Sequence, residues 1–446
     1  MNGVLTALRT EAARCRDMRF GELPNRTRTT AHHSLLDWLG CAVAGATEDA
    51  SRLALEALAP DPGSHVVIGS RPVAGWRDAI LLNGVHGHAL DFDDMLPEIQ
   101  GHPSAAVFPA LFILGDDRGS TVAEVLEAYV AGVEIGAWVA RRVMPEHYDV
   151  GWHGTGTMGV FAAAAACAKL LDLDEDQWIS ALDFAATQSA GLRSLFGTPG
   201  KPLHAGKSAE AGALAARLSR AGAVSHGQGL TAERGFFTVY GAGKTAPAEP
   251  AGNTWALDGV LYKVYASCYM TQSVVDGALE MRERAGGAPI TAIEVTVSPK
   301  LRDVCAIEDP QNANEAKFSV HATTALGLLG HDLASEQTFS PEALAGAGYR
   351  ALRERVTLTY DDQLAGNEPR SRMRVELDSG TVLETDRDRG LPERDLAARE
   401  ATLTRKVRGL VEPLLGSRAV TDLIATALDP SSALGDLRLG DLRLDT

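Results

Sequence analysis

The sequence has few cysteines and no long apolar stretch. Its five cysteines are an odd number, lie far apart along the chain and form no CxxC pair, so they indicate neither a disulfide framework nor a zinc finger. No apolar run reaches the length that a membrane span needs. The first residues, MNGVLTALRTEAARCRD, carry charges throughout and lack the apolar core of a secretion signal. These absences predict a protein of the reducing cytoplasm with no membrane partner.

Positive charge is also in short supply. The chain has 42 lysines and arginines against 58 aspartates and glutamates, a formal net charge of -16. This balance argues against nucleic acid or an anionic membrane surface as a partner. If the substrate is an anion, the positive groups that bind it must be local. The length of 446 residues and the hydrophobic share of 45% predict a globular protein of two or three domains.

The spacing of apolar residues changes from helical to strand-like and back to helical. Ile293, Val295 and Val297 alternate with polar residues, and MRVELDSGTVLETD around Ser379 predicts a hairpin. We therefore expect a mainly α fold with α+β: a large all-helical domain over residues 1–264, completed by 396–446, and a smaller inserted α+β lid domain over 265–395. The expected helices include Thr29–Ala46 (capped by its threonines), Thr121–Val143, Asp174–Ser189, Ala313–Leu329, Ala397–Leu415 and Ala419–Leu428, and residues 60–72 are expected to be irregular.

The segment HALDFDDMLPEIQGHPSAAVFPAL places three aspartates and two histidines beside an apolar helix. A helix over Leu81–Leu90 is expected to run into the aspartates, of which Asp91 is the first. A new helix is expected to start at Pro103, so His102 lies just before a helix N-terminus, where free N–H groups attract anions. Alternatively, the aspartates are the polar end of one helix and His102 is an ordinary cap.

A second cluster lies at the start of the segment GWHGTGTMGVFAAAAACAKLL. Gly154, Gly156 and Gly159 spell G-x-G-x-x-G, but no apolar strand precedes them, so we reject a dinucleotide site. The glycines instead let another backbone or a ligand approach the N-terminus of a helix. His153 stands at that N-terminus.

A third cluster lies in GLRSLFGTPGKPLHAGKSAEAG. Gly206, Lys207 and Ser208 resemble the end of a P-loop, but the required first glycine is replaced by Lys201, so ATP is not expected to bind. Lys201 lies between glycine and proline, in an expected rigid loop that leads into a helix. It is either a solvated charge or a fixed cation directed at a carboxylate, and its spacing alone does not decide.

Taken together, these segments resemble the MmgE/PrpD family in order and spacing. The resemblance rests on HHSLLDWLGCAVAGA, NGVHGHALDFDDM, GHPSAAVFPAL, the two later clusters and NEAKFSVHATTAL, and it is strongest from Ala31 to Gly212. That family includes 2-methylcitrate dehydratase, cis-aconitate decarboxylase and iminodisuccinate epimerase. The resemblance implies a homodimer of two-domain subunits that uses no metal or organic cofactor, with an active site between the domains.

The resemblance also implies site residues. The family's site acid, two histidines and first lysine match Asp91, His102, His153 and Lys201, which are the expected catalytic residues. The expected substrate-binding residues are Lys263, Cys268, Met95, His321 and Lys207. Proton transfer next to a carboxylate needs these types, because lysine stabilises the growing negative charge and histidine moves a proton near neutral pH.

The chain departs from the family pattern at several of these positions. Met95 replaces a threonine of the decarboxylases, and the loop that follows is one residue longer. The segment K-x-Y-P-x-C/H-R has lost its proline and arginine, where Ala266 and Tyr269 stand, and a tyrosine of the decarboxylases is His321 here. Losing an arginine and a threonine, which bind anions, predicts a substrate with fewer carboxylates or another shape.

Three functions are therefore considered. The first is a cofactor-independent lyase that acts on a small di- or tricarboxylate by dehydration, hydration or decarboxylation. The second is an epimerase or isomerase of a small dicarboxylate, which needs only the proton transfer. The third is a binding protein that keeps the fold without the chemistry, as the departures at Met95, Ala266, Tyr269 and Gln272 would allow.

Overall fold

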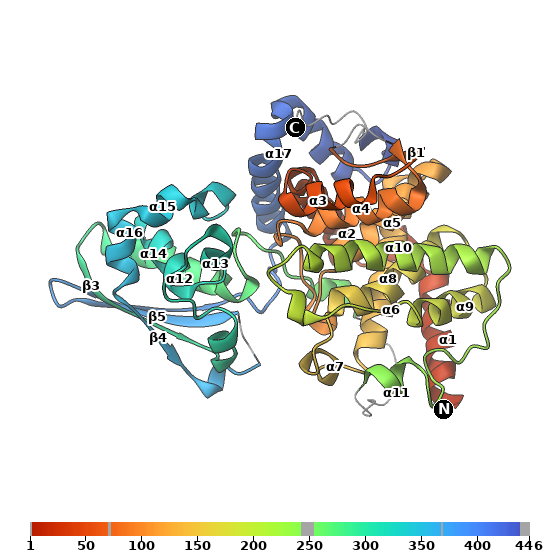
Figure 1. The fold of residues 1–446 in the computed structure, drawn as a ribbon, viewed down its shortest axis with the longest axis horizontal. Coiled ribbons are helices and arrows are strands. Elements are labelled where there is room, and N and C mark those ends of the chain that lie inside the picture. Colours follow the sequence, from red (N-terminus) through yellow and green to blue (C-terminus); the bar gives the residue numbers. More distant parts are fainter. Residues whose placement is uncertain (1, 70–72, 242–253, 367–368, 438–446) are drawn as a thin grey trace. The chain divides into compact units, whose positions relative to one another are not determined.

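The computed structural model describes residues 2–69, 73–241, 254–366 and 369–437 (Figure 1). The chain divides into two compact units. Unit 1 comprises Met1–Tyr262 and Arg394–Thr446, and unit 2 comprises Lys263–Glu393. The sequence had suggested boundaries at 264/265 and 395/396. Each unit is described below by itself.

Unit 1 is built from helices around one large apolar core. Its central helices are buried on almost every side, and α8 consists largely of alanine and glycine, which lets its neighbours approach closely. The helices are α1 (Asn2–Asp17), α2 (Asn25–Gly45), α3 (Asp49–Leu58), α4 (Trp76–His88), α5 (Pro103–Arg118), α6 (Val122–Ala140), α7 (Glu146–Asp149), α8 (Gly154–Leu170), α9 (Glu175–Ala186), α10 (Gly200–Arg220), α11 (Phe236–Tyr240) and α17 (Leu396–Leu428).

Local capping signals explain why several helices begin where the sequence predicted. Thr121 and Glu124 form a capping box at the start of α6, and Asp174 and Gln177 form another at the start of α9. Pro103 occupies the first turn of α5, where its missing N–H has no partner to lose. The predicted starts of these three helices are confirmed.

Two local predictions are wrong. Helix α2 begins four residues before the expected threonine cap, after Pro24. Thr30 lies inside this helix, and its hydroxyl donates to the Arg26 carbonyl oxygen (2.8 Å), which is a mid-helix use of threonine rather than a cap. The stretch expected to be irregular contains strand β1 (Pro62–Val66), which pairs antiparallel with β2 (Val73–Ala74).

Unit 2 is a small α+β domain, as predicted. Its mixed sheet has the order β4-β3-β5-β6, with β3 parallel to β4 and antiparallel to β5. The predicted helix over Ala313–Leu329 is divided in two, because Ser319 caps the second half by accepting from the Ala322 N–H. The elements are β3 (Ile290–Val297), β4 (Val356–Tyr360), β5 (Arg370–Leu377), β6 (Val382–Asp388), α12 (Gln272–Ala285), α13 (Ala313–Lys317), α14 (Val320–Leu329), α15 (Pro341–Ala345) and α16 (Ala347–Arg353).

Helix α17 brings the C-terminal part of the chain back to the N-terminal part. It bends at Gly416, which has a left-handed backbone (φ 79°), and it packs on α2 (Figure 1). From α17, the buried Lys406 ammonium donates to Asp37 Oδ1 of α2 (2.6 Å) and to the Phe92 carbonyl oxygen (2.6 Å). It also lies 4.0 Å from the centre of the Phe92 ring. One ammonium therefore joins both helices to the loop that follows α4.

Among the described residues, no helix combines the length and the apolar character that crossing a bilayer requires. All five cysteines are buried, and none of them forms a disulfide.

We predict that Lys406→Met lowers the free energy of unfolding by about 3–5 kcal/mol, because it leaves the Asp37 carboxylate buried without its counter-charge. Urea unfolding followed by tryptophan fluorescence measures this. Arg405→Met, at an exposed neighbour on the same helix, should change stability by less than about 0.5 kcal/mol.

The double variant Asp37→Asn/Lys406→Met should recover part of the loss, because it removes both charges. A double variant as unstable as the sum of the two single variants would contradict a direct interaction between these side chains.

Candidate active site

The loop after α4 turns sharply at Asp91. The Asp91 N–H donates to the His88 carbonyl oxygen (3.1 Å), and Asp91 itself has a left-handed backbone with φ 50°. Aspartate tolerates this conformation better than most residues, because its short side chain can bond locally. Helix α4 therefore ends at His88, two residues earlier than predicted, and the three aspartates lie in the loop beyond it.

His102 is the N-cap residue of α5, and its tautomer follows from its contacts. Its Nδ1 lies 2.7 Å from the Asp94 carbonyl oxygen, which can only accept, so Nδ1 carries the hydrogen. Its Nε2 then has the free electron pair and lies 3.7 Å from Asp91 Oδ1. Burial lowers the pKa of His102 to about 4, an effect that the nearby Asp93 charge only partly offsets. At neutral pH, His102 is an uncharged imidazole able to accept a proton.

Lys201 lies in the first turn of α10 rather than in a loop, which corrects the prediction. The helix begins one residue earlier, at Gly200. The Lys201 ammonium lies 2.6 Å from Asp91 Oδ1, with only 13% of the side chain exposed. The same Asp91 oxygen thus faces both the ammonium and the free nitrogen of His102. Of the two readings of Lys201, the structure supports the cation directed at a carboxylate.

His153 caps α8 beside this group. Its Nδ1 lies 3.0 Å from Nδ1 of His204 in α10, so one of these nitrogens donates and the other accepts. Its ring meets Phe196 edge to face, with 4.8 Å between the ring centres. Burial, followed by the charge of Lys201, holds the pKa of His153 well below its usual value. His153 is a second buried, neutral imidazole.

The glycines near His153 are used for close packing of backbone. A Cβ atom on Gly154 would come within 2.1 Å of the Ile99 carbonyl oxygen, and one on Gly156 within 2.4 Å of the Ala190 carbonyl oxygen. The loop before α5 and the segment before α10 therefore press directly against the start of α8. Backbone contacts thus explain Gly154 and Gly156, whereas a Cβ atom on Gly159 would come within 2.7 Å of the Ala106 side chain.

Three helix N-termini converge at the site. His102 precedes α5, His153 precedes α8 and Lys201 lies in the first turn of α10, and these three helices pack against one another. The positive ends of their dipoles add to the charge of Lys201. These groups supply local positive charge for an anion, although the chain as a whole is acidic.

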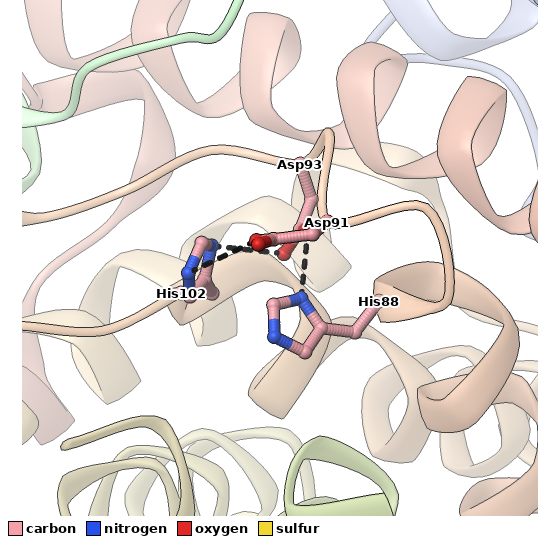
Figure 2. Close-up of side chains that lie close together, drawn as sticks. All are labelled: His88, Asp91, Asp93 and His102. Atoms are coloured by element: carbon pink, nitrogen blue, oxygen red, sulfur yellow. Dashed lines mark hydrogen bonds and ion pairs between the residues drawn. The ribbon is translucent and has the colours of Figure 1, made fainter. Parts of the chain in front are cut away.

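Figure 2 shows four side chains that could hold a metal ion: His88, Asp91, Asp93 and His102 offer one donor atom each, within 4.8 Å of one another. Histidine and carboxylate ligands suit several transition metals. However, the Nδ1 hydrogen of His88 points at Asp93, that of His102 points at Asp94, and Asp91 already faces an ammonium. These hydrogen bonds engage Nδ1 of both histidines, so Nε2 is the nitrogen that either histidine could offer to a metal.

The other predicted site residues lie elsewhere. Lys207 pairs with Glu210, and 53% of its side chain is exposed, so the structure does not bring it to the cluster. The backbone of Met95, in the same loop as Asp91, exchanges two hydrogen bonds with Leu261, both 2.8 Å.

Lys263, Cys268 and His321 belong to unit 2. There Lys263 and Cys268 are buried, and the Cys268 N–H donates to the Lys317 carbonyl oxygen (2.9 Å). His321 lines a cavity of about 580 Å³ together with Glu308 and Arg353. The roles of these three residues in substrate binding stay predictions.

The sequence prediction gave no site role to three residues of this group: His88, Asp93 and His204. His204 stands three residues after Lys201, and in a helix this spacing puts both on one face, a signal that could have revealed it. Asp93 and His88 were part of the noted cluster, but no spacing rule shows which aspartate faces which histidine.

The fold and the site together define a class of protein. Its members have two units, are mainly helical, and combine an aspartate–lysine pair with neutral histidines at helix N-termini. The chain matches the MmgE/PrpD N-terminal domain over residues 12–249 and the MmgE/PrpD C-terminal domain over residues 265–429. It therefore belongs to the MmgE/PrpD family, as the sequence resemblance had implied.

Curated relatives include two kinds of protein. A cis-aconitate decarboxylase-like protein of Aspergillus oryzae is 30% identical over 56% of this chain and 56% of its own length, so the chain spans little more than half of that relative. The 2-methylcitrate dehydratase of Salmonella typhimurium is 24% identical over 75% of this chain and 73% of its own length, and that of Escherichia coli is 24% identical over 62% and 61%.

The buried Asp94 provides a test of the site's electrostatics. Ser104 donates to both of its oxygens, through its N–H (3.2 Å) and its hydroxyl (2.6 Å). Burial, together with the charges of Asp37 and Asp93, raises the pKa of Asp94 to about 8. The carboxyl group is therefore protonated at neutral pH.

We predict that Asp94→Asn becomes more stable relative to the unchanged protein as the pH rises from about 4 to 8. The folded state binds the Asp94 proton more tightly than the unfolded chain does, so Asp94 destabilises the fold progressively over this range, by up to about 1.4 kcal/mol per pH unit. Urea unfolding at pH 5, 6, 7 and 8 measures the difference. A difference that does not vary with pH would show that Asp94 is ionised in the fold.

Proposed function

We propose that this chain is a lyase that acts on a small di- or tricarboxylate by dehydration, hydration or decarboxylation, with proton transfer next to a carboxylate and without a metal or organic cofactor. The observation that carries the proposal is the position of Asp91 Oδ1, 2.6 Å from the Lys201 ammonium and 3.7 Å from the free Nε2 of His102. A cation and a neutral base thus meet at one point. The names of the relatives from Aspergillus, Salmonella and Escherichia support the same chemistry.

In the dehydration direction, His102 Nε2 accepts the proton from the carbon next to a carboxylate. The electron pair of the broken C–H bond moves toward that carboxylate and then forms the double bond, while the hydroxyl group leaves with a proton as water. Lys201 and the helix N-termini stabilise the doubly charged intermediate, which is usually the largest contribution to catalysis of this kind. Asp91 holds the ammonium in place, and the His102 imidazolium can pass the proton that it has taken to the leaving hydroxyl group, which restores the neutral base.

The two buried histidines also favour a second candidate, an epimerase or isomerase of a small dicarboxylate. His102 and His153 cap different helices, so one could remove a proton from a carbon and the other, in its protonated form, return one. Deuterium at that carbon without net elimination would favour this activity over the lyase.

We also propose, from the family resemblance, a cytoplasmic homodimer whose site is completed by Lys263, Cys268, Met95 and His321. Light scattering coupled to size exclusion measures the oligomeric state.

We predict that the protein turns over, or exchanges deuterium into, at least one acid from a panel that includes 2-methylcitrate, cis-aconitate and smaller dicarboxylates, as followed by proton NMR in heavy water. Lys201→Ala and His102→Ala should each lower kcat/KM by at least about 100-fold, because each removes a group that acts on the growing charge or the proton.

Lys207→Ala is the matched comparison, since it removes a lysine of the same helix whose ammonium faces Glu210 and solvent. We expect its kcat/KM to change less than about threefold. Full activity in both Lys201→Ala and His102→Ala would eliminate this site, and a large loss in Lys207→Ala would restore the sequence prediction that Lys207 binds substrate.

A further inference from the structure

A single carboxylate, that of Asp93, faces two imidazoles. His88, the last residue of α4, donates from Nδ1 to Asp93 Oδ1 (2.8 Å), and Asp93 Oδ2 lies 3.3 Å from Nδ1 of His102 (Figure 2). All three side chains are buried: 1% of His88, none of Asp93 and 7% of His102 is exposed. The His88 and His102 rings are also in contact, with 4.4 Å between their centres.

Asp93 is the aspartate of the loop that can serve as a counter-charge to His102. Asp91 is paired with an ammonium, and Asp94 is held as the neutral acid. Burial alone would raise the pKa of Asp93, but the electrostatic attraction of the His88 and His102 imidazoles and their hydrogen-bonding groups outweigh burial and place that pKa well below its usual range. The carboxylate of Asp93 is therefore ionised.

The proton transfer assigned to His102 creates a charge that needs such a partner. When Nε2 takes the proton, the C–H bond of the substrate breaks, its electron pair stays on the substrate, and His102 becomes a buried imidazolium. An isolated cation in this place would be costly, because little water can reach it. The Asp93 oxygen on the opposite edge of the ring offsets this cost.

We propose that Asp93 and His88 are positioning residues for His102. The Asp94 carbonyl oxygen sets the tautomer of His102 whose Nε2 is the base. The nearby charge of Asp93 adds to that preference and stabilises the imidazolium that forms, and His88 fixes the Asp93 carboxylate in the orientation that does both. This inference rests on the proposed function, because it concerns the base of that reaction.

His88 can act on the site through only one of its two ring nitrogens. Its Nε2 is buried and has no hydrogen-bond partner among the described residues. The one hydrogen bond of the ring is thus the one that it donates to Asp93. An asparagine, whose amide nitrogen occupies about the place of Nδ1, can make the same hydrogen bond, whereas alanine cannot.

The experiment compares Asp93→Asn, His88→Ala and His88→Asn with the unchanged protein. In Asp93→Asn the amide has no charge and can donate to Nδ1, in competition with the Asp94 carbonyl oxygen that accepts the Nδ1 hydrogen, and this favours the wrong tautomer of His102. We expect kcat to fall by about 10²–10⁴-fold, the range that loss of an equivalent aspartate can produce in a histidine-based site, while KM changes less than about threefold. His88→Ala should lower kcat by at least about tenfold, and His88→Asn should restore most of the loss.

His86→Asn is the matched control. His86 is buried in the same helix, and its Nδ1 donates to the Ile68 carbonyl oxygen (3.1 Å), away from the cluster. We expect its kcat to stay within about threefold of the unchanged protein. A fall in His86→Asn as large as that in His88→Ala would show that changes in this helix act through folding and would overturn the proposal.

Two readouts separate positioning from a structural role. The charged and titratable groups that face His102 are Asp91, Asp93 and Asp94 from its loop, His88 from α4, His153 before α8 and Lys201 from α10. Replacing Asp93 alone removes one negative charge from this set. The acid limb of the profile of kcat/KM against pH should therefore move to lower pH in Asp93→Asn, because the imidazolium is less stable.

Nitrogen NMR of histidine-labelled protein is the second readout, with His102 assigned from His102→Gln. It should show hydrogen on Nδ1 in the unchanged protein and on Nε2 in a substantial fraction of Asp93→Asn.

The outcomes distinguish the two proposals. If no acid is turned over and no deuterium is taken up, the proposed function fails, while the nitrogen NMR still decides whether Asp93 contributes to the tautomer preference of His102. If the protein is active and Asp93→Asn keeps its kcat, or loses kcat with an unchanged tautomer and pH profile, the role of Asp93 in positioning is wrong.

Discussion

The arrangement of the site depends on one buried ammonium. Lys406 donates to Asp37 of α2 and to the carbonyl oxygen of Phe92, and it lies over the Phe92 ring. Phe92 is completely buried between Asp91 and Asp93, so holding its backbone also fixes the directions of its two neighbours. Asp91 then points toward Lys201, and Asp93 points toward the two imidazoles. A helix near the end of the chain thus determines the geometry of a loop more than three hundred residues earlier.

Within this loop, three aspartates are held in three different states by their surroundings. Asp91 lies against the Lys201 ammonium, Asp93 accepts from imidazole, and Asp94 is bonded to Ser104 in a place where burial and two like charges favour the neutral acid. Ionised groups packed this closely would repel one another strongly. Keeping one of them protonated lowers that repulsion and leaves a single carboxylate free to balance a charge on His102.

Local signals in the sequence made the starts of several helices predictable. A proline in the first turn predicts the start of α5, and a threonine–glutamate pair predicts that of α6, because helix caps depend on residues only a few positions apart. The family resemblance selected Asp91, His102 and Lys201, which the structure brings together. It could not exclude Lys207, because only the position of Glu210 shows where that ammonium goes. The roles of Asp93 and His88 were equally out of reach, since they follow from contacts across the turn at Asp91.

The positive field of the site acts both for and against the proposed reaction. Three helix N-termini and Lys201 attract a carboxylate and stabilise the charge that grows on it. The same field, together with burial, makes His102 and His153 harder to protonate, which keeps them neutral at pH 7 but weakens them as bases. A base in this field therefore needs a negative charge of its own, on the side of the ring away from the substrate. Asp93 lies on that side, at Nδ1 of His102, and so it can raise the basicity of Nε2 without competing with the substrate for Lys201.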